Sequence, residues 1–295
     1  MNSRRNFLRK SGMLASGLAF GSLAAKATQG TSFLNNFDKL REFGLQLWTI
    51  KDVLPKDPQG TLQQVSSFGY KQIEGFEGGK GMFWGMTNKE FKKIMDDLGM
   101  QFISSHCDMN NNNGQFEKKA ALAGEIGMKY LICPFYGAQK TLDDYKKAAD
   151  KFNASGEICK KNGLRFAYHN HWYTFQVQDG VQPQEILMKN TDPGLVDYEM
   201  DIYWVATVGA DPAEWLQKYP NRFRLVHIKD RKKDAGPKDF DASCDVGTGS
   251  IDFAKIAKVA SKSGVQYYIV EQEKFAGSTL DAAKVDAQYM KSLEV

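Results

Sequence analysis

The chain has 295 residues, with 39 Lys or Arg against 35 Asp or Glu, and its formal net charge is +4. Residues 1–27 hold five of the positive charges and no acid, so the remaining chain carries a charge of −1 without them. That balance excludes the basic surface that nucleic-acid binding requires. The length suits one α/β barrel domain.

The amino terminus predicts an export signal. The pair Arg4-Arg5 is followed by a stretch of small and apolar residues, from about 12 to 25, that is too short to span a bilayer. Ala25-Lys26-Ala27 then offers a cleavage site before Thr28. The segment resembles a twin-arginine signal. We therefore expect a signal peptide over 1–27, a single domain over 28–295, a periplasmic location and no stable membrane association after cleavage.

A repeated glycine pattern organises the rest of the chain. In each case a helical segment ends at Gly and a β-prone run opens about two residues later, because Gly accepts the left-handed conformation that closes a helix. The glycines are Gly69, Gly99, Gly127, Gly163 and Gly264. Between them, apolar residues recur at helical spacing, for example Phe91, Ile94 and Met95 after Thr87, a predicted N-cap.

Eight β-prone runs in the chain predict eight strands. Most of them start 27 to 35 residues apart, which is the length of one β-loop-α-loop unit. Their ranges are about 44–49, 71–76, 101–106, 129–135, 164–169, 195–201, 223–228 and 266–271. A polar loop over 229–250 fills the longer last interval. Eight βα units favour a closed (β/α)8 TIM barrel. An open doubly wound sheet is less favoured, because no glycine-rich dinucleotide turn follows the first strand.

All four histidines of the chain end or closely follow predicted strands. They are His106, His169, His171 and His227. In a barrel of this kind the carboxyl ends of the strands form one rim, where a metal ion or a substrate binds. The alternative for any one of them is a hydrogen-bonded core histidine.

Acidic residues follow the same rule. The second strand ends with Glu74, the sixth with Glu199 and Asp201, and the eighth with Glu271. The last four strands thus bring His, Asp, His and Glu to one rim, and this mix of nitrogen and carboxylate donors suits Mn²⁺, Zn²⁺, Co²⁺, Fe²⁺ or Ni²⁺. We therefore predict one divalent metal ion of open identity.

With these residues in place, the chain resembles the xylose isomerase-like TIM barrel family of sugar phosphate isomerases and epimerases. The matching segments are Gly44-Leu45-Gln46-Leu47, Tyr168-His169-Asn170-His171, Asp201-Ile202-Tyr203-Trp204, Val226-His227-Ile228-Lys229-Asp230 and Gly247-Thr248-Gly249-Ser250-Ile251-Asp252. The resemblance implies a metal held by residues on strands 5 to 8. Carried over by position, these are His169, Asp201, His227 and Glu271.

One position departs from the family pattern. Many relatives have a Glu on strand 5 that also transfers a proton, where this chain has His169, and Thr174 stands where others carry a further Glu. Glu271 and His169 are therefore the predicted catalytic pair. The predicted substrate-binding residues are His106, His171, Lys229 and Trp204. For the first three, orienting the ligand residues is an equal alternative, and for Trp204 the alternative is a core position.

These residues suit proton abstraction next to a metal-bound carbonyl. The first hypothesis is an isomerase or epimerase acting on a non-phosphorylated sugar or keto-sugar through an enediolate. The second is a lyase or dehydratase that eliminates a β-substituent from a keto-glycoside or keto-polyol, and the third is a non-catalytic sugar-binding barrel. The expected partner is a small carbohydrate, no nucleic acid is expected, and a homodimer is left open.

Overall fold

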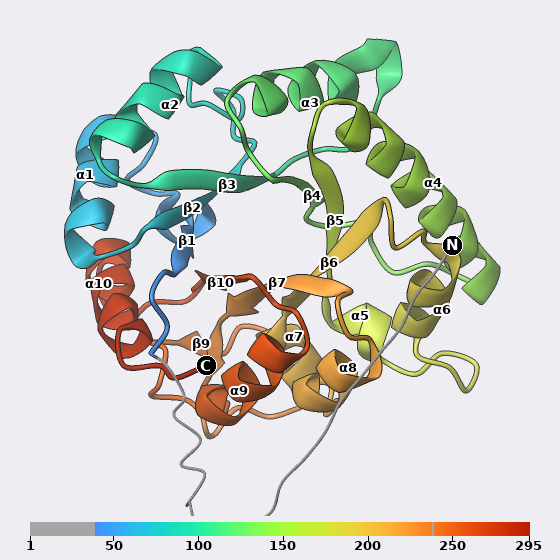
Figure 1. The fold of residues 1–295 in the computed structure, drawn as a ribbon. Helices are drawn as coiled ribbons and strands as arrows, with labels where there is room; N and C mark the ends of the chain where they lie inside the picture. The colour runs from blue at the N-terminus through green and yellow to red at the C-terminus, as the bar shows by residue number, and fades with distance from the viewer. Residues whose placement is uncertain (1–38, 238) are drawn as a thin grey trace, which may run out of the picture. The chain divides into compact units, whose positions relative to one another are not determined.

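The structure, a computed structural model, describes residues 39–237 and 239–295, so the predicted export signal lies outside the described residues. In the described part, eight parallel strands close into a barrel in the order β1-β10-β7-β6-β5-β4-β3-β2 (Figure 1). The barrel strands are β1 Gly44–Gln46, β2 Gln72–Phe76, β3 Gln101–His106, β4 Tyr130–Cys133, β5 Arg165–His169, β6 Val196–Asp201, β7 Phe223–Ile228 and β10 Tyr267–Val270. The predicted TIM barrel is confirmed.

Helices surround the strands on the outside of the barrel (Figure 1). They are α1 Pro58–Phe68, α2 Asn88–Asp97, α3 Gln115–Glu125, α4 Leu142–Lys161, α5 Trp172–Phe175, α6 Pro183–Asn190, α7 Ile202–Thr207, α8 Pro212–Lys218, α9 Phe253–Lys262 and α10 Thr279–Met290. The five glycines predicted to close helices all have positive φ, between 63° and 108°. These left-handed glycines confirm the predicted pattern, in which a helix ends at Gly and a strand follows.

Local chemistry explains where helices begin. At α2 the Thr87 side chain accepts a hydrogen bond from the Glu90 N–H, and the Glu90 carboxylate accepts one from the Thr87 N–H. This reciprocal cap satisfies amides that the helix itself leaves without partners. At α4, Thr141 caps the first turn, acids follow it, and Lys160 and Lys161 lie in the last turn, an arrangement that matches the helix dipole.

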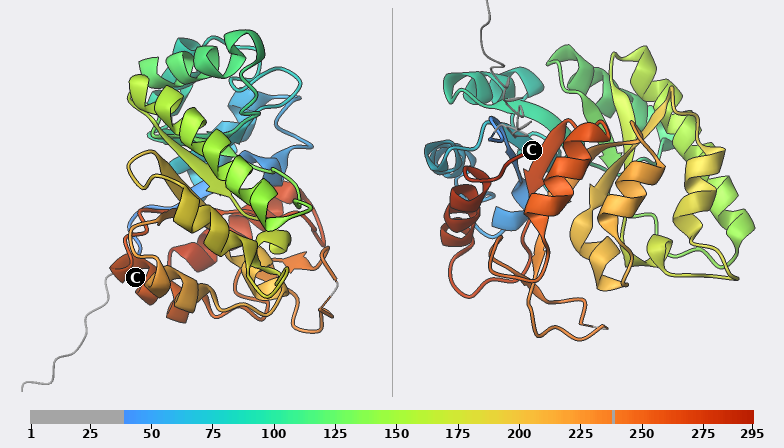
Figure 2. Two further views of the ribbon diagram at one scale, coloured as in Figure 1. Left: turned by 90° about the vertical axis from the view of Figure 1, so that its right-hand side faces the viewer. Right: turned by 60° about the horizontal axis from the view of Figure 1, so that its bottom comes forward.

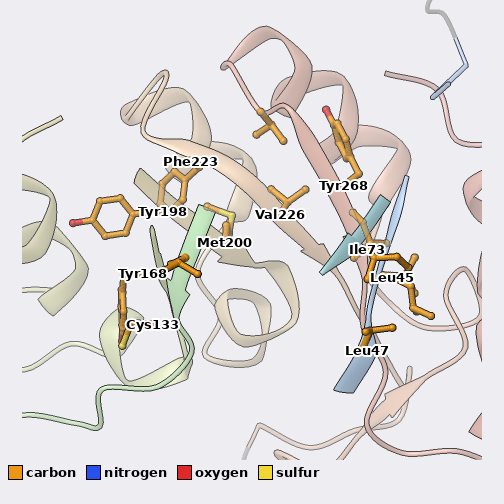
Figure 3. Close-up of a cluster of buried hydrophobic side chains, with 14 of the residues drawn as sticks. Leu45, Leu47, Ile73, Cys133, Tyr168, Tyr198, Met200, Phe223, Val226 and Tyr268 are labelled. Carbon is orange, nitrogen blue, oxygen red and sulfur yellow. The ribbon is translucent and has the colours of Figure 1, made fainter. Parts of the chain in front are cut away.

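The buried apolar side chains form two clusters. Leu45, Ile73, Met200 and Val226 belong to the large apolar core that includes the surrounding helices (Figure 3). A smaller apolar cluster consists of Tyr130, Ile132, Ala167 and Leu225. Alternate residues of a strand face opposite sides, so the neighbours of the first group point into the barrel. That alternation delivers the polar side chains of the site to the interior.

Two predicted segments differ from the structure. The first strand ends at Gln46 rather than near 49, because Gln46 accepts a hydrogen bond from the Trp48 N–H and opens a 3₁₀ turn, η1 Leu47–Ile50. Segment 229–250 is not only a loop: β8 Asp230–Arg231 pairs antiparallel with β9 Ser243–Cys244. The Asp230 carboxylate holds the rest of this segment by accepting hydrogen bonds from Gly247 and Gly249.

Residues 231–237 and 239–250 project beyond the barrel strands, in orange in the right-hand view of Figure 2. A second short 3₁₀ turn, η2 Asn112–Gly114, precedes α3. Among the described residues, no helix combines the length and the apolar character needed to cross a membrane.

Candidate functional site

Four side chains from β5, β6, β7 and the end of β10 converge at the carboxyl end of the barrel. One donor atom from each lies within 4.8 Å of the others, and all four residues are buried. We call this set the metal cluster; it consists of His169, Asp201, His227 and Glu271. The structure thus brings together the four residues that the sequence predicts as ligands.

The metal cluster has the separations and the unused donors that a cation requires. His169 Nε2 lies 3.5 Å from Asp201 Oδ2, and His227 Nδ1 lies 3.3 Å from Glu271 Oε2. Donors about 2.0–2.2 Å from one metal ion are separated by roughly such distances. His169 Nε2, Asp201 Oδ2 and His227 Nδ1 are buried without a hydrogen-bond partner. Since orphaned buried polar atoms are costly, the residues fit a divalent ion.

The surrounding structure orients each of these donors. His169 Nδ1 lies 3.0 Å from the Pro134 carbonyl, so its N–H donates there and leaves the Nε2 lone pair for the cluster. Asp201 caps α7 by accepting from the Trp204 N–H through Oδ1, which leaves Oδ2 free to face the cluster. The Asn170 side chain holds the Asp201 backbone by bonding to both its N–H and its carbonyl.

A second buried polar set lies next to the metal cluster and shares His227 with it. We call it the support cluster; it consists of Glu74, His106, Glu199 and the shared His227. His227 Nε2 is 2.7 Å from Glu74 Oε1, and His106 Nε2 is 2.8 Å from Glu199 Oε2. Neither β2 and β7 nor β3 and β6 are neighbours in the barrel, so these contacts cross its interior.

The support cluster is made of hydrogen bonds rather than spaced donors. Glu74 also accepts from Gln46 Nε2 at 2.8 Å and from the Ser104 hydroxyl at 2.6 Å. Because Glu74 takes the N–H of His227 on Nε2, the other nitrogen, Nδ1, presents its lone pair to the metal cluster. Glu74 and Glu199 lie at predicted strand ends, but the sequence alone gives them no role.

The charges of the two clusters depend on each other. Burial alone would lower the pKa of His106, but Glu74 and Glu199 raise it to about 9, so this imidazole is positively charged. Burial would raise the pKa of Glu271, but the Lys229 ammonium lowers it well below its usual range. Glu271 therefore stays ionised inside the barrel, where the buried Lys229 ammonium compensates its charge.

The predicted substrate-binding residues divide into two groups. His106 and His171 line a cavity at this end of the barrel, together with His169 and Glu271. His171 is neutral, since burial and the neighbouring His169 lower its pKa to about 3.

Lys229 and Trp204 lie behind the cavity wall. Lys229 is buried, and its ammonium pairs with Glu273, with Glu271 at 3.3 Å and with Asp201 at 3.6 Å. Trp204 is buried too; its ring stacks on His171 with a centroid separation of 5.4 Å, and Lys229 Nζ lies 4.7 Å from the Trp204 ring centroid. Their positions suit holding other site residues in place.

The family comparison agrees with this architecture. Residues 62–293 match the family model described as xylose isomerase-like TIM barrel. Inosose dehydratase from Clostridium perfringens is 30% identical over 83% of this chain and 94% of its own length. Inosose dehydratase from Clostridium beijerinckii is 29% identical over 83% of this chain and 93% of its own length.

Solved structures give the same result. A sugar phosphate isomerase/epimerase from Parabacteroides distasonis has a TM-score of 0.73 and 29% identity, covering 85% of this chain and 97% of its own. The IolI protein with a bound zinc atom has a TM-score of 0.67 at 14% identity, covering 84% of this chain and 95% of its own, a likeness of fold. This chain is therefore an enzyme of the xylose isomerase-like superfamily and belongs to the xylose isomerase-like TIM barrel family.

Proposed function

We propose that this enzyme is a divalent-metal-dependent lyase that eliminates a β-substituent from a keto-polyol or keto-glycoside. The observation that carries the proposal is the asymmetry of the metal cluster. On the cavity side it presents one carboxylate, Glu271, while the strand β5 position is the imidazole of His169. Elimination needs a base on one face of the substrate, whereas two-base epimerisation needs one on each face.

The names of the relatives support the same choice. Both inosose dehydratases cover most of this chain, and a dehydratase removes water from its substrate by elimination. This evidence favours the lyase over an isomerase or epimerase acting through the same enediolate. The substrate is proposed to be a neutral carbohydrate, and the periplasmic location remains a prediction from residues 1–27.

His169, Asp201, His227 and Glu271 would hold the metal. When bound, the ion supplies a Lewis acid that polarises the ketone and stabilises the negative charge formed on its oxygen. Glu271 is ionised and lines the cavity, so it is the group assigned to take the proton from the carbon next to the carbonyl. Its low pKa makes it a modest base, which suits a proton that the ketone has already acidified.

The neighbouring side chains complete the reaction site. The positive charge of His106, on the cavity wall, stabilises the developing oxyanion. His171 is uncharged and can exchange hydrogen bonds with substrate hydroxyls. Lys229 holds Glu271 and Asp201 in place and offsets their charge, because its ammonium lies within 3.6 Å of both.

The test is to incubate the metal-loaded protein with an inosose in D₂O and follow the products by NMR. We expect loss of water and an unsaturated ketone, and no product after the metal is removed by chelation. Deuterium incorporation with an epimerised or isomerised sugar, and no unsaturated product, would contradict the lyase and favour the isomerase or epimerase. The substitution Glu271→Gln should stop turnover while retaining part of the bound metal.

A further inference from the structure

The cavity above the metal cluster has a volume of about 960 Å³. It begins at His106, His169 and Glu271 and extends outward past Trp48 and Phe135. Pockets for drug-sized ligands range from roughly 300 to 1,000 Å³, so this one lies at the upper end. A single keto-polyol ring placed at the metal cluster would leave much of the outer part to water.

Two exposed aromatic rings line that outer part. Trp48 is 40% exposed and Phe135 is 61% exposed. Among the described residues, one other aromatic side chain is exposed to a similar degree: Phe240, at 36%, which lines a different cavity. Trp48 follows β1 and Phe135 follows β4, so the ends of β2 and β3 lie between them around the rim. Exposed apolar surface gathered at one cavity indicates a ligand that covers it.

Both rings are fixed by neighbouring side chains, and Lys51 Nζ lies over one face of the Trp48 ring, 3.9 Å from its centroid. The Trp48 ring meets Phe76 edge-to-face at a centroid distance of 5.0 Å, and Phe76 meets Trp84 in the same way at 4.9 Å. Phe135 meets His171 edge-to-face at 5.1 Å. Rings held in this way bind a flat partner at a low cost in conformational entropy. Phe135 thus contacts His171, which is itself a neighbour of the metal cluster.

Polar groups occupy the rim between the two rings. Lys119 Nζ lies 2.7 Å from the Glu77 carboxylate and donates to the Asp108 carbonyl at 3.0 Å. Glu77 in turn accepts a hydrogen bond from the Asp108 N–H. Apolar ring faces beside a fixed polar rim match a ring with one apolar face and a hydroxylated edge.

We propose that the site binds two rings: a keto-sugar ring at the metal cluster and its leaving group, a sugar or aryl ring joined through oxygen, against Trp48 and Phe135. This inference rests on the proposed lyase function and names its substrate class as a keto-glycoside. The C–H bond next to the ketone breaks, and the proton goes to Glu271. The adjacent C–O bond to the second ring breaks, and a double bond forms between the two carbons. The leaving oxygen takes the proton back from Glu271 and departs as an alcohol or phenol, so Glu271 is regenerated and no oxidant or reductant is needed.

The experiment compares two substrates on the metal-loaded protein: an inosose, and a 4-nitrophenyl glucoside oxidised to the ketone at C3. We expect a higher kcat/KM for the keto-glycoside. We expect Trp48→Ala and Phe135→Ala each to lower that value about 5- to 10-fold, mainly through KM, and to leave the inosose value within about 2-fold. Trp48→Phe should recover most of the loss. Val285→Ala, at an exposed apolar residue of α10 outside the cavity, is the control and should leave kcat/KM unchanged for both substrates.

A binding measurement separates this inference from the proposed function. Calorimetry with unoxidised 4-nitrophenyl glucoside and with glucose needs no turnover, and we expect tighter binding of the glycoside and loss of that preference in Trp48→Ala. If inosose is dehydrated but the glycoside binds no better than glucose, the second-ring site is wrong and the lyase stands. If neither ketone reacts but the binding preference depends on Trp48, the lyase is wrong and the second-ring site stands. A shift in oligomeric state of Trp48→Ala, with unchanged ligand affinity, would show an interface between copies instead.

Discussion

The metal cluster and the support cluster lie side by side in one barrel, are equally buried and share His227, yet they differ in spacing. Three imidazole–carboxylate pairs of the metal cluster lie 3.3 to 3.9 Å apart, and three of its donor atoms have no hydrogen-bond partner. In the support cluster the carboxylates and imidazoles meet at 2.7 to 3.3 Å, and apart from Nδ1 of the shared His227 only one buried atom, Glu199 Oε1, is without a hydrogen-bond partner. Residue types alone do not show which residues hold the metal ion and which orient its ligands. The distances between donor atoms and the number of atoms without a hydrogen-bond partner do show it.

The largest effect should follow from removing a shared or central ligand. We expect His227→Ala and Asp201→Ala each to abolish metal binding, because the remaining donors leave the cation with too few ligands. Elemental analysis after metal loading and dialysis measures this. Asp234→Asn, on an exposed turn, is the control and should keep full metal content. Wild-type metal content in either cluster variant would contradict the assignment.

Substituting the two histidines at the end of strand β5 tests which of them holds the metal ion. His169→Ala should greatly reduce metal content, while His171→Ala should retain it and weaken substrate binding, since only His169 belongs to the cluster. Metal titration followed by KM measurement distinguishes the two. If His169→Ala keeps its metal, His171 becomes the strand-5 candidate.

The support cluster should tune affinity without holding the ion. Glu74→Gln places an amide where three donors, from Gln46, Ser104 and His227, need acceptors. We expect metal affinity to fall about 10- to 100-fold because His227 loses its orienting partner. The measurement is a competition titration with a chelator. An unchanged affinity in a folded variant would show that His227 is oriented by other contacts.

The smallest effect is expected at Asp286, a buried acid that, unlike the acids of the two clusters, is not paired with a cation. Burial raises the pKa of Asp286 to about 8; its Oδ1 accepts from the Val246 N–H, and its Oδ2 has no partner. The folded protein therefore holds a proton that the unfolded chain releases near pH 4, so stability falls as pH rises from about 4 to 8.

We expect Asp286→Asn to stabilise the fold by about 1–2 kcal/mol above pH 8 and to make no difference near pH 4, since the amide resembles the protonated acid. Thermal unfolding of both proteins across this pH range measures the effect. An equal stability gain at every pH would contradict the titration of Asp286.

The alternation of side chains along a strand shows which site residues could be predicted from the sequence. Glu199 stands two residues before Asp201 on β6, so the period of two already places both on the same face. Glu74 lies in β2 and Glu77 directly follows it, but only the structure shows that Glu74 crosses the interior to His227 while Glu77 pairs with Lys119 at the rim. Phe135 had no distinguishing pattern, because a residue just after a strand can point to either side.

What the sequence determined by itself is the barrel and the set of strand-end residues, because helix caps, glycine positions and strand spacing are local properties. The tertiary structure decided which of these residues act together. Lys229 and Trp204, predicted to bind substrate, instead lie behind the cavity wall against Glu271 and His171. Distances across the barrel depend on closure of all eight strands and on the packing inside it, which no local pattern encodes.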